Sequence, residues 1–260
     1  MSSELSGKTA VVTGSTAGIG RAIALELASA GAALVVHGRR AQAAEQVAAE
    51  IRARGGDALV ITADLVAPAT HEPLVEQAWN WRNGIDIWVH NAGADVLTGD
   101  AAGWSFDEKL EVLWQVDVRA AVRLCRLVGG RMKAQREAAP NVGPAVILNM
   151  GWDQAEHGMA GDSGEMFAAV KGAVMAFSRS LARSLAPQVR VNCLAPGWIR
   201  TAWGDTASEY WQRRAVRESL LERWGTPDDV ARVARFLASP AADFITGQVI
   251  PINGGLRIGG

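Results

Sequence analysis

Tyrosine is nearly absent from this chain. Its 260 residues contain one tyrosine, Tyr210, beside ten tryptophans and five phenylalanines. Cysteine is also scarce, because only Cys125 and Cys193 are present and neither belongs to a Cys-x-x-Cys pair. Two such residues exclude a disulfide framework. We expect both to be small buried apolar side chains in a reducing compartment.

Charge of one sign and long apolar runs are missing too. Lys and Arg number 26 against 27 Asp and Glu, a formal net charge of −1, which gives no electrostatic reason to expect nucleic acid or an anionic membrane as partner. No apolar run approaches the roughly 18–20 residues of a membrane span. The segment Met1–Lys8 is short and polar, so the sequence predicts no signal peptide and a cytoplasmic protein.

Short apolar runs alternate with longer helical patterns along the whole chain. The predicted strands are Thr9–Thr13, Ala33–His37, Ala58–Ala63, Asp86–Asn91, Ala145–Asn149, Val189–Cys193 and Gln248–Pro251. Most are continuously apolar, which is typical of parallel strands buried on both faces. Between them, four-residue spacings such as Ile19, Ile23 and Leu27 indicate amphipathic crossover helices. The sequence therefore predicts one α/β domain over residues 1–260, a Rossmann-like, doubly wound parallel sheet of about seven strands with helices on both faces.

A glycine-rich turn follows the first predicted strand. It reads Thr13-Gly14-Ser15-Thr16-Ala17-Gly18-Ile19-Gly20. Glycine lets the chain turn tightly and lets a phosphate approach backbone N–H groups at the start of a helix. The spacing is Gly-x-x-x-Gly-x-Gly rather than Gly-x-Gly-x-x-Gly, and an ordinary tight turn is the alternative. The position behind the first strand of a seven-strand pattern favours a phosphate site.

The second predicted strand ends in His37-Gly38-Arg39-Arg40. An acidic residue there would bind the adenosine ribose hydroxyls of NAD, whereas an arginine suits the 2′-phosphate of NADP. No acid is present, so the sequence predicts NADP(H) in preference to NAD(H). In the alternative interpretation, Arg39 and Arg40 only form a solvated start of the next helix.

Several motifs in register resemble the short-chain dehydrogenase/reductase family over some 240 residues. They are the Thr13–Gly20 turn, Asp64-Leu65, His90-Asn91-Ala92-Gly93, Ala195-Pro196-Gly197 with Ile199 and Thr201, Arg223–Val230, and Gly247-Gln248 with Asn253-Gly254-Gly255. The turn, the basic pair and this resemblance together predict cofactor contacts from Gly14, Ser15, Thr16, Gly18, Ile19, Gly20, Arg39, Arg40, Asp64, Leu65, Asn91, Ala92, Gly93, Lys171, Pro196, Gly197, Ile199 and Thr201.

The catalytic positions of that family are altered here. The family pattern uses Asn, Ser, Tyr and Lys, with Tyr as proton donor four residues before Lys. Lys171 is present, but Phe167 stands at the Tyr position, Trp152 near the Ser position and Asp117 at the Asn position. Phenylalanine has no proton to give, so the resemblance implies an atypical active site. Lys171 is expected to bind the ribose and to place a positive charge at the site, unless it is merely a solvated helix lysine.

Nearby residues are candidates for the missing proton donor. Asp153 and His157 lie in a stretch before Lys171 that is about two residues longer than is usual in the family. They and Asp117 are predicted acid/base groups, the last if burial raises its pKa. The alternatives are turn residues or solvated charges for Asp153 and His157, and a helix-bending role for Asp117. The sequence predicts no metal site.

Aromatic residues crowd the region around 198–222, which the resemblance identifies as a substrate-covering loop. The predicted substrate pocket contains Trp152, Phe167, Trp198, Trp203, Tyr210 and Trp211. Several indoles around one pocket would favour a planar or hydrophobic substrate, with core packing as the alternative. Core packing or subunit contact is the expectation for Trp79, Trp81, Trp88, Trp104 and Trp114.

Two functions remain open from the sequence. The first is an NADP(H)-dependent oxidoreductase that transfers hydride to or from a small carbonyl or activated C=C substrate; some relatives that reduce dienoyl substrates also lack the family tyrosine. The second is a catalytically inactive NADP(H)-binding protein with a structural or sensing role. The resemblance also implies a homotetramer or dimer built on the helical pattern from Phe106 to Met132.

Overall fold

A single parallel β-sheet forms the centre of the described part of the molecule. The computed structural model describes residues 4–257; residues 1–3 and 258–260, and with them the start of the Met1–Lys8 segment, lie outside the described residues. The strands are β1 (Thr9–Val12), β2 (Ala33–Gly38), β3 (Ala58–Thr62), β4 (Ile87–His90), β5 (Ala145–Met150), β6 (Val189–Pro196) and β7 (Val249–Ile252). They are parallel in the order β3-β2-β1-β4-β5-β6-β7. The predicted Rossmann-like sheet is therefore confirmed, with strand ends that move by three residues or fewer.

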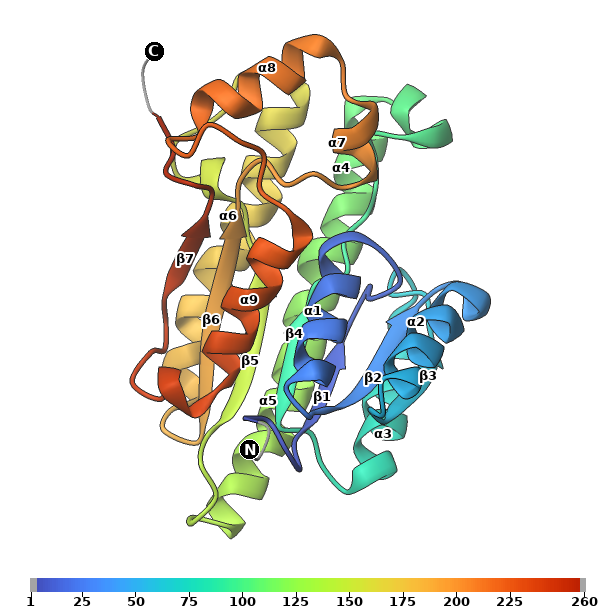
Figure 1. Cartoon of the computed structure of the whole chain (residues 1–260), viewed down its shortest axis with the longest axis vertical. Helices are drawn as coiled ribbons and strands as arrows, with labels where there is room; N and C mark the ends of the chain where they lie inside the picture. Colours follow the sequence, from blue (N-terminus) through green and yellow to red (C-terminus); the bar gives the residue numbers. More distant parts are fainter. Residues whose placement is uncertain (1–3, 258–260) are drawn as a thin grey trace.

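Helices cover both faces of the sheet. They are α1 (Gly18–Ser29), α2 (Ala41–Ala53), α3 (His71–Arg82), α4 (Phe106–Leu113), α5 (Ala120–Ala138), α6 (Asp162–Leu185), α7 (Ala202–Thr206), α8 (Glu209–Glu218) and α9 (Pro227–Ala238). Residues of α1, α2 and α9 share one apolar core with the sheet, and residues of α3, α5 and α6 share the other. In Figure 1, α1 and α9 lie in front of the sheet and α5 and α6 lie behind it.

Neighbouring residues of each strand enter opposite cores. In β1, Ala10 and Val12 join the core under α1, while Val11 joins the core under α3 and α5. This is why the strands read as continuous apolar runs. Cys125 and Cys193 are both buried and free, as predicted.

The predicted Phe106–Met132 pattern forms a helix with an irregular middle. Between α4 and α5, residues Trp114–Arg119 form a π-helical segment. A π-helical turn shifts the register of the side chains and is frequent at functional sites. Here it carries Asp117, whose side chain is almost fully buried.

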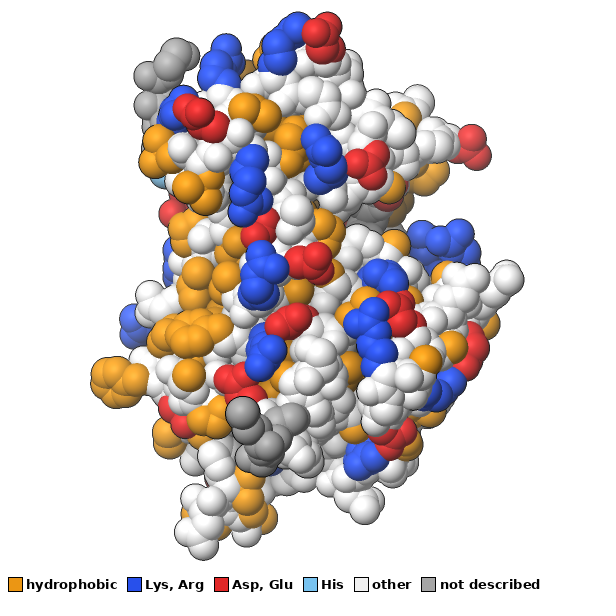
Figure 2. Space-filling model, in the orientation of Figure 1, with side chains coloured by type: hydrophobic (Ala, Val, Ile, Leu, Met, Phe, Trp, Pro, Cys, Tyr) orange, Lys and Arg blue, Asp and Glu red, His pale blue; other side chains and the backbone are white. Residues whose placement is uncertain are grey.

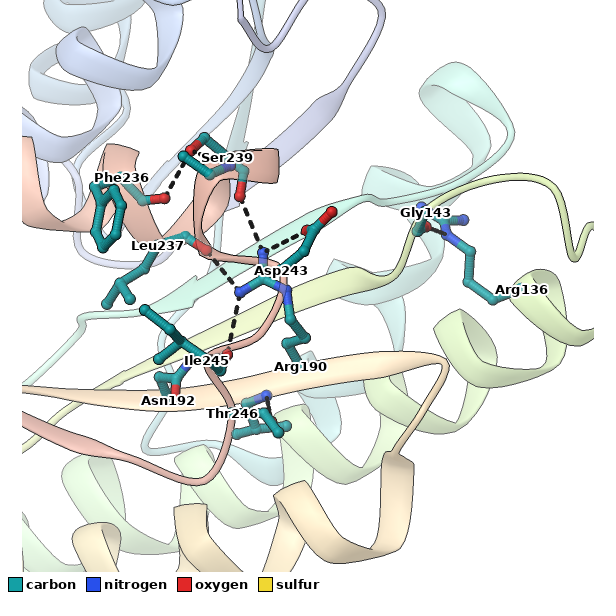
Figure 3. Close-up of polar contacts among 12 residues, drawn as sticks. Arg136, Gly143, Arg190, Asn192, Phe236, Leu237, Ser239, Asp243, Ile245 and Thr246 are labelled. Atoms are coloured by element: carbon teal, nitrogen blue, oxygen red, sulfur yellow. Dashed lines mark hydrogen bonds and ion pairs between the residues drawn. The ribbon is translucent and has the colours of Figure 1, made fainter.

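A buried arginine ties the far end of α9 to the sheet (Figure 3). Arg190 of β6 donates to the carbonyl oxygens of Leu237 at 2.9 Å, Ser239 at 3.3 Å and Ile245 at 3.4 Å. These include carbonyls at the C-terminal end of α9, which have no partner within a helix. The guanidinium thereby satisfies buried acceptors and orients the chain that leads into β7.

The segment 198–222 lies across the carboxyl edge of the sheet. It contains α7 and α8, which sit above the ends of β5 and β6 in Figure 1. Among residues 4–257, no helix is both long and apolar enough to cross a membrane.

Candidate active site

A cleft of about 650 Å³ opens at the carboxyl edge of the sheet. It lies where the chain order reverses, because β1 has β2 on one side and β4 on the other. Ligands of open α/β sheets bind at this switch point. Figure 2 shows the hollow in this face of the molecule, between the parts that carry α7 and α2.

The glycine-rich turn forms the floor of the cleft. Gly14 and Gly18 have φ of 64° and 52°, a region that favours glycine. A Cβ atom on Gly14 would lie 2.8 Å from Cα of Ala92, and one on Gly20 would lie 2.3 Å from Nδ2 of Asn91. The glycines are therefore required by close packing against the chain after β4 as well as by backbone conformation.

The start of α1 lines the cleft, and the first backbone N–H groups of a helix have no partner within that helix. Ala17, the N-cap residue, makes no side-chain cap, and the first turn contains no acidic residue. Thr16, Ala17 and Gly18 all line the cleft. Free N–H groups and the positive end of the helix dipole make this an anion-binding position.

Arg39 stands beside this helix end. It lines the cleft, is exposed and makes no ion pair with any residue in the part of the chain that the structure describes. Arg40 is exposed as well, but it does not line the cleft. Asp64 and Leu65 line the same end, on the side of β3. A free guanidinium beside a helix start is suited to a second phosphate.

Two predicted cofactor residues hold the turn in place. Asn91 donates from Nδ2 to the carbonyl oxygens of Thr13 and Gly14, both at 3.0 Å, and it also lines the cleft. Ser15 is buried and does not line it; its backbone N–H donates to the carbonyl of His37 at 2.9 Å. Ser15 therefore joins the turn to β2.

An ion pair occupies the opposite end of the cleft. Nζ of Lys171 lies 2.7 Å from Oδ2 of Asp117, and both residues line the cleft. Oδ1 of Asp117 accepts from the backbone N–H of Ala94 at 2.9 Å, and Lys171 donates to the carbonyl of Met150 at 3.4 Å. The side chain of Asp117 is 2% exposed, against 15% for Lys171. The buried carboxylate of Asp117 therefore holds the ammonium group of Lys171 in place, while part of the Lys171 side chain remains exposed to the cleft.

Aromatic rings stand where the resemblance places hydroxyl groups. Phe167 lines the cleft one helical turn before Lys171 on α6. Its ring meets that of Trp152 edge to face, with centroids 6.3 Å apart. Neither ring has an acidic proton, although the indole N–H of Trp152 can donate a hydrogen bond. Trp152 itself does not line the cleft.

Asp153 and His157 lie outside the cleft. Asp153 is buried, its Oδ2 accepts from Nδ2 of Asn253 at 3.1 Å, and its Oδ1 has no partner among the described residues. Burial raises the pKa of Asp153 to about 6, although its hydrogen bond with Asn253 opposes the shift. His157 is exposed. Neither residue lines the cleft with Lys171, so their acid/base role stays a prediction.

The end of β6 and the segment after it lie in two environments. Thr201 lines the cleft, whereas Pro196, Gly197 and Ile199 do not. A Cβ atom on Gly197 would lie 2.6 Å from Cβ of Asn253, which shows how closely this segment packs against the end of β7. Gly93 and Ala92, on the side of β4, line the cleft as expected for cofactor residues.

Four tryptophans pack together beside the cleft. Trp198 has its ring centroid 6.2 Å from Trp203, 5.5 Å from Trp211 and 6.1 Å from Trp224. Of these four, only Trp203 lines the cleft. Tyr210 is exposed and packs on Trp211, with centroids 5.1 Å apart. Most of the predicted aromatic pocket therefore stabilises the α7–α8 segment.

Trp104 and His37 line the cleft, and neither was a predicted site residue. Of the two expectations for Trp104, core packing is wrong, because the residue is 40% exposed and lies just before α4, while subunit contact stays a prediction. Nothing in its local sequence signals this position, because it depends on how the chain after β4 folds over the cleft. His37 is adjacent to the basic pair, and its place at the end of a strand was the available signal.

Known proteins match over almost the whole chain. The sequence profile of a family described as "Enoyl-(Acyl carrier protein) reductase" matches residues 14–257. The chain is 34% identical over 266 residues to the 3-oxoacyl-[acyl-carrier-protein] reductase FabG of Aquifex aeolicus, covering 98% of this chain and 100% of that protein. It is 32% identical over 255 residues to tropinone reductase-like 3 of Erythroxylum coca, covering 96% and 93%.

Solved structures agree with the fold. A 7α-hydroxysteroid dehydrogenase in complex with NADH and 7-oxo glycochenodeoxycholic acid matches with a TM-score of 0.87 and 30% identity, covering 98% of this chain and 96% of that one. A gluconate 5-dehydrogenase from Burkholderia cenocepacia in complex with NADP and tartrate matches with a TM-score of 0.85 and 29% identity, covering 98% and 97%.

Proposed function

Because the chain belongs to the short-chain dehydrogenase/reductase family, we propose that it is an NADP(H)-dependent oxidoreductase acting on a small, planar or hydrophobic carbonyl or activated C=C substrate. One observation carries the proposal. A single cleft joins a glycine-rich turn and a free Arg39 at one end to the Lys171–Asp117 ion pair at the other. The first end suits a dinucleotide, and the second holds a proton beside the place where a substrate would react.

The residues of the first end fit NADP(H). The uncapped start of α1 would hold the pyrophosphate, and Arg39 would hold the 2′-phosphate that distinguishes NADP(H) from NAD(H). Asp64 and Leu65 would contact the adenine ring, and Asn91 would fix the turn. The bound nucleotide supplies the hydride; the protein supplies binding, orientation and the proton.

Lys171 is the proposed proton donor. In the reducing direction, the substrate gains hydride at carbon, and the ammonium of Lys171 gives a proton to the oxygen or carbon that has gained negative charge. The carboxylate of Asp117 pairs with Nζ of Lys171 and holds this nitrogen at the cleft wall. Solvent then returns the proton to Nζ, because the side chain of Lys171 is partly exposed. Phe167 leaves no phenol to compete for this role.

Apolar side chains surround the proposed substrate position. Leu97, Trp104, Val112, Val116, Phe167 and Trp203 line the cleft at the end of the ion pair. Indole and phenyl faces favour flat apolar ligands. This wall supports a planar or hydrophobic substrate, and it excludes water around the transferred hydride.

A second candidate is an inactive NADP(H)-binding protein. The edge-to-face contact of Phe167 with Trp152 favours it, because two rings fill positions where the family pattern has hydroxyl groups. Such a protein would bind the nucleotide without turnover and would use it for stability or sensing.

Nucleotide titration and an absorbance assay separate the two candidates. We expect NADPH to bind more tightly than NADH, and NADPH absorbance to fall when planar enones or aromatic aldehydes are added. Product analysis of the enones then shows whether the C=O or the C=C bond is reduced. Equal affinities for the two nucleotides would remove the NADP(H) preference, and tight binding without turnover across the panel would favour the inactive protein.

We also propose that the chain forms a homodimer or homotetramer through α4 and α5. Trp114, which follows α4, is 43% exposed in the isolated chain and would be covered in such an assembly. Light scattering at increasing concentration tests this, and a monomer at all concentrations would contradict it.

A further inference from the structure

His37 is a buried histidine on the wall of the cleft that hydride transfer does not use. It belongs to β2, is 1% exposed and precedes the Gly38-Arg39 pair. Its Nδ1 lies 3.2 Å from the backbone nitrogen of Gly14, the first glycine of the turn. Its Nε2 is buried and has no hydrogen-bond partner among residues 4–257.

The contact with Gly14 determines the state of the ring. A backbone N–H can only donate, so Nδ1 must accept and must carry no proton. The ring is therefore neutral, with its proton on Nε2. Burial favours the same state, because it lowers the pKa of His37 to about 4 against the opposing effects of the Ala63 backbone and the Asp64 carboxylate. His90, the nearest titratable group on β4, has a pKa lowered to about 3 and is neutral too.

Hydrogen bonds between His37 and Ser15 reinforce this link. The backbone N–H of His37 donates to Oγ of Ser15 at 3.0 Å, and the backbone N–H of Ser15 donates to the carbonyl of His37 at 2.9 Å. Four hydrogen bonds thus fix the Gly14-Ser15 turn to the end of β2, because Oγ of Ser15 also donates to the carbonyl of His37 at 3.4 Å. The bond from Gly14 to the His37 ring is the one that a substitution of His37 can remove while the other three remain.

We propose that His37 is a positioning residue for cofactor binding, whose neutral imidazole anchors the amide of Gly14 and so fixes the phosphate-binding turn. This inference rests on the proposed NADP(H) function. The turn contacts the pyrophosphate that NADPH and NADH share, so loss of the anchor weakens the binding of both by the same factor. Arg39 contacts only the 2′-phosphate, so its loss weakens NADPH alone.

Four variants test the anchor by calorimetric titration with NADPH and NADH near neutral pH. His37→Leu keeps the bulk and removes the acceptor, so we expect both nucleotides to bind about tenfold more weakly, the value of one hydrogen bond. In His37→Asn the amide oxygen takes the place of Nδ1, and affinity should stay within about threefold of wild type. His37→Gln puts its oxygen one bond farther out and should resemble His37→Leu. Arg39→Leu is the matched control, with loss for NADPH only.

Three results would overturn the inference. They are wild-type affinity in His37→Leu, loss for NADPH alone in that variant, and equal weakness of His37→Asn and His37→Leu. If His37→Leu does not fold, the comparison of Asn with Gln at the same position replaces it. If wild type binds neither nucleotide, the proposed function fails.

The ring state has a readout that needs no cofactor. ¹⁵N NMR of histidine-labelled protein, with the His37 signals assigned by their loss in His37→Asn, should show a neutral ring with hydrogen on Nε2 at neutral pH. A proton on Nδ1 or an imidazolium ring would contradict the anchor even if NADPH binds.

Discussion

The two ends of the cleft differ in whether backbone or side chains form their surface. We call the end with the glycine-rich turn and Arg39 the nucleotide end, and the end with Lys171 and Asp117 the reacting end. At the nucleotide end, backbone groups, glycines and main-chain hydrogen bonds form the surface, and a Cβ atom on Gly14 or Gly20 would collide with the chain after β4. At the reacting end, side chains form the surface, with one ion pair between Lys171 and Asp117 set among apolar and aromatic groups. A binding surface made of backbone requires particular residues, such as glycine, at most of its positions. A surface made of side chains can change its chemistry by substitution while the fold is kept. This difference explains how the chain can keep the cofactor motifs of the family while Phe167 stands at the position of the family's tyrosine.

The largest effect should come from removing the charge at the reacting end. Lys171→Met takes away the proposed proton donor, so we expect turnover to fall about a thousandfold, within the usual range for general acid catalysis. NADPH affinity should fall by only about tenfold, because the predicted ribose contact of Lys171 is lost while the phosphate contacts of the nucleotide end remain. Steady-state kinetics and titration measure the two effects.

Lys133→Met is the matched control for this prediction. Lys133 is a surface lysine of α5 that donates to the carbonyl of Ser184, outside the cleft. Its replacement should leave turnover unchanged. Equal turnover in Lys171→Met and wild type would show that the ion pair is structural only.

The next effect breaks the nucleotide end without touching the reacting end. Arg39→Leu removes the proposed 2′-phosphate contact, so we expect NADPH to bind about 10–100-fold more weakly, as for a lost charge-assisted hydrogen bond, while NADH affinity is unchanged. Arg40→Leu is the control, because Arg40 is exposed but does not line the cleft. Equal losses in the two variants would indicate a general charge effect.

Asp153 is a buried carboxyl that lies outside the cleft, so its removal should change stability and leave turnover unchanged. Its pKa is raised from 3.8 to about 6, so the folded protein binds more protons than the unfolded chain between these values. Its contribution to stability therefore falls as pH rises through that window. We expect Asp153→Asn to be about 1–3 kcal/mol more stable than wild type near pH 8, with the difference vanishing well below the unfolded pKa of 3.8, at about pH 3.

Chemical denaturation at several pH values measures this effect. Turnover of Asp153→Asn should match wild type, since Asp153 does not line the cleft. A loss of turnover in this variant would support the predicted acid/base role of Asp153.

The smallest effect concerns the aromatic wall. Trp203 packs on Trp198 and lines the cleft, so Trp203→Leu should raise KM for planar substrates about fivefold, near the value of one aromatic contact, with a smaller change for saturated ones. Trp81→Leu on α3 is the control, since Trp81 does not line the cleft. An equal rise for both substrate types would argue against stacking on Trp203.

Most of the fold could be predicted, because buried parallel strands leave continuous apolar runs. All seven strands were found this way, and β6 differs most, since it continues three residues beyond Cys193 to Pro196. That extension depends on pairing with β7, from Cys193 with Val249 to Pro196 with Ile252. Local sequence patterns do not predict which distant segments pair, so they could not predict this extension of β6.

The candidate site could be predicted in part, and the division follows the two ends of the cleft. Glycine spacing marked the nucleotide end, including Gly14, Gly18 and Gly20, because backbone geometry demands those residues. At the reacting end, the sequence proposed Asp153 and His157 by their closeness along the chain to Lys171, yet neither lines the cleft. Trp104 was missed, because only the path of the chain after β4 brings it there.

Deuteride transfer tests the central claim most directly. NADPH carrying deuterium at the reactive carbon of its nicotinamide is mixed with a panel of planar carbonyl and enone compounds, and product deuterium is measured by mass spectrometry for wild type and Lys171→Met. We expect deuterium in a product with wild type and a rate about a thousandfold lower in Lys171→Met. Tight NADPH binding without transfer to any compound, or transfer at equal rates in both proteins, would contradict it.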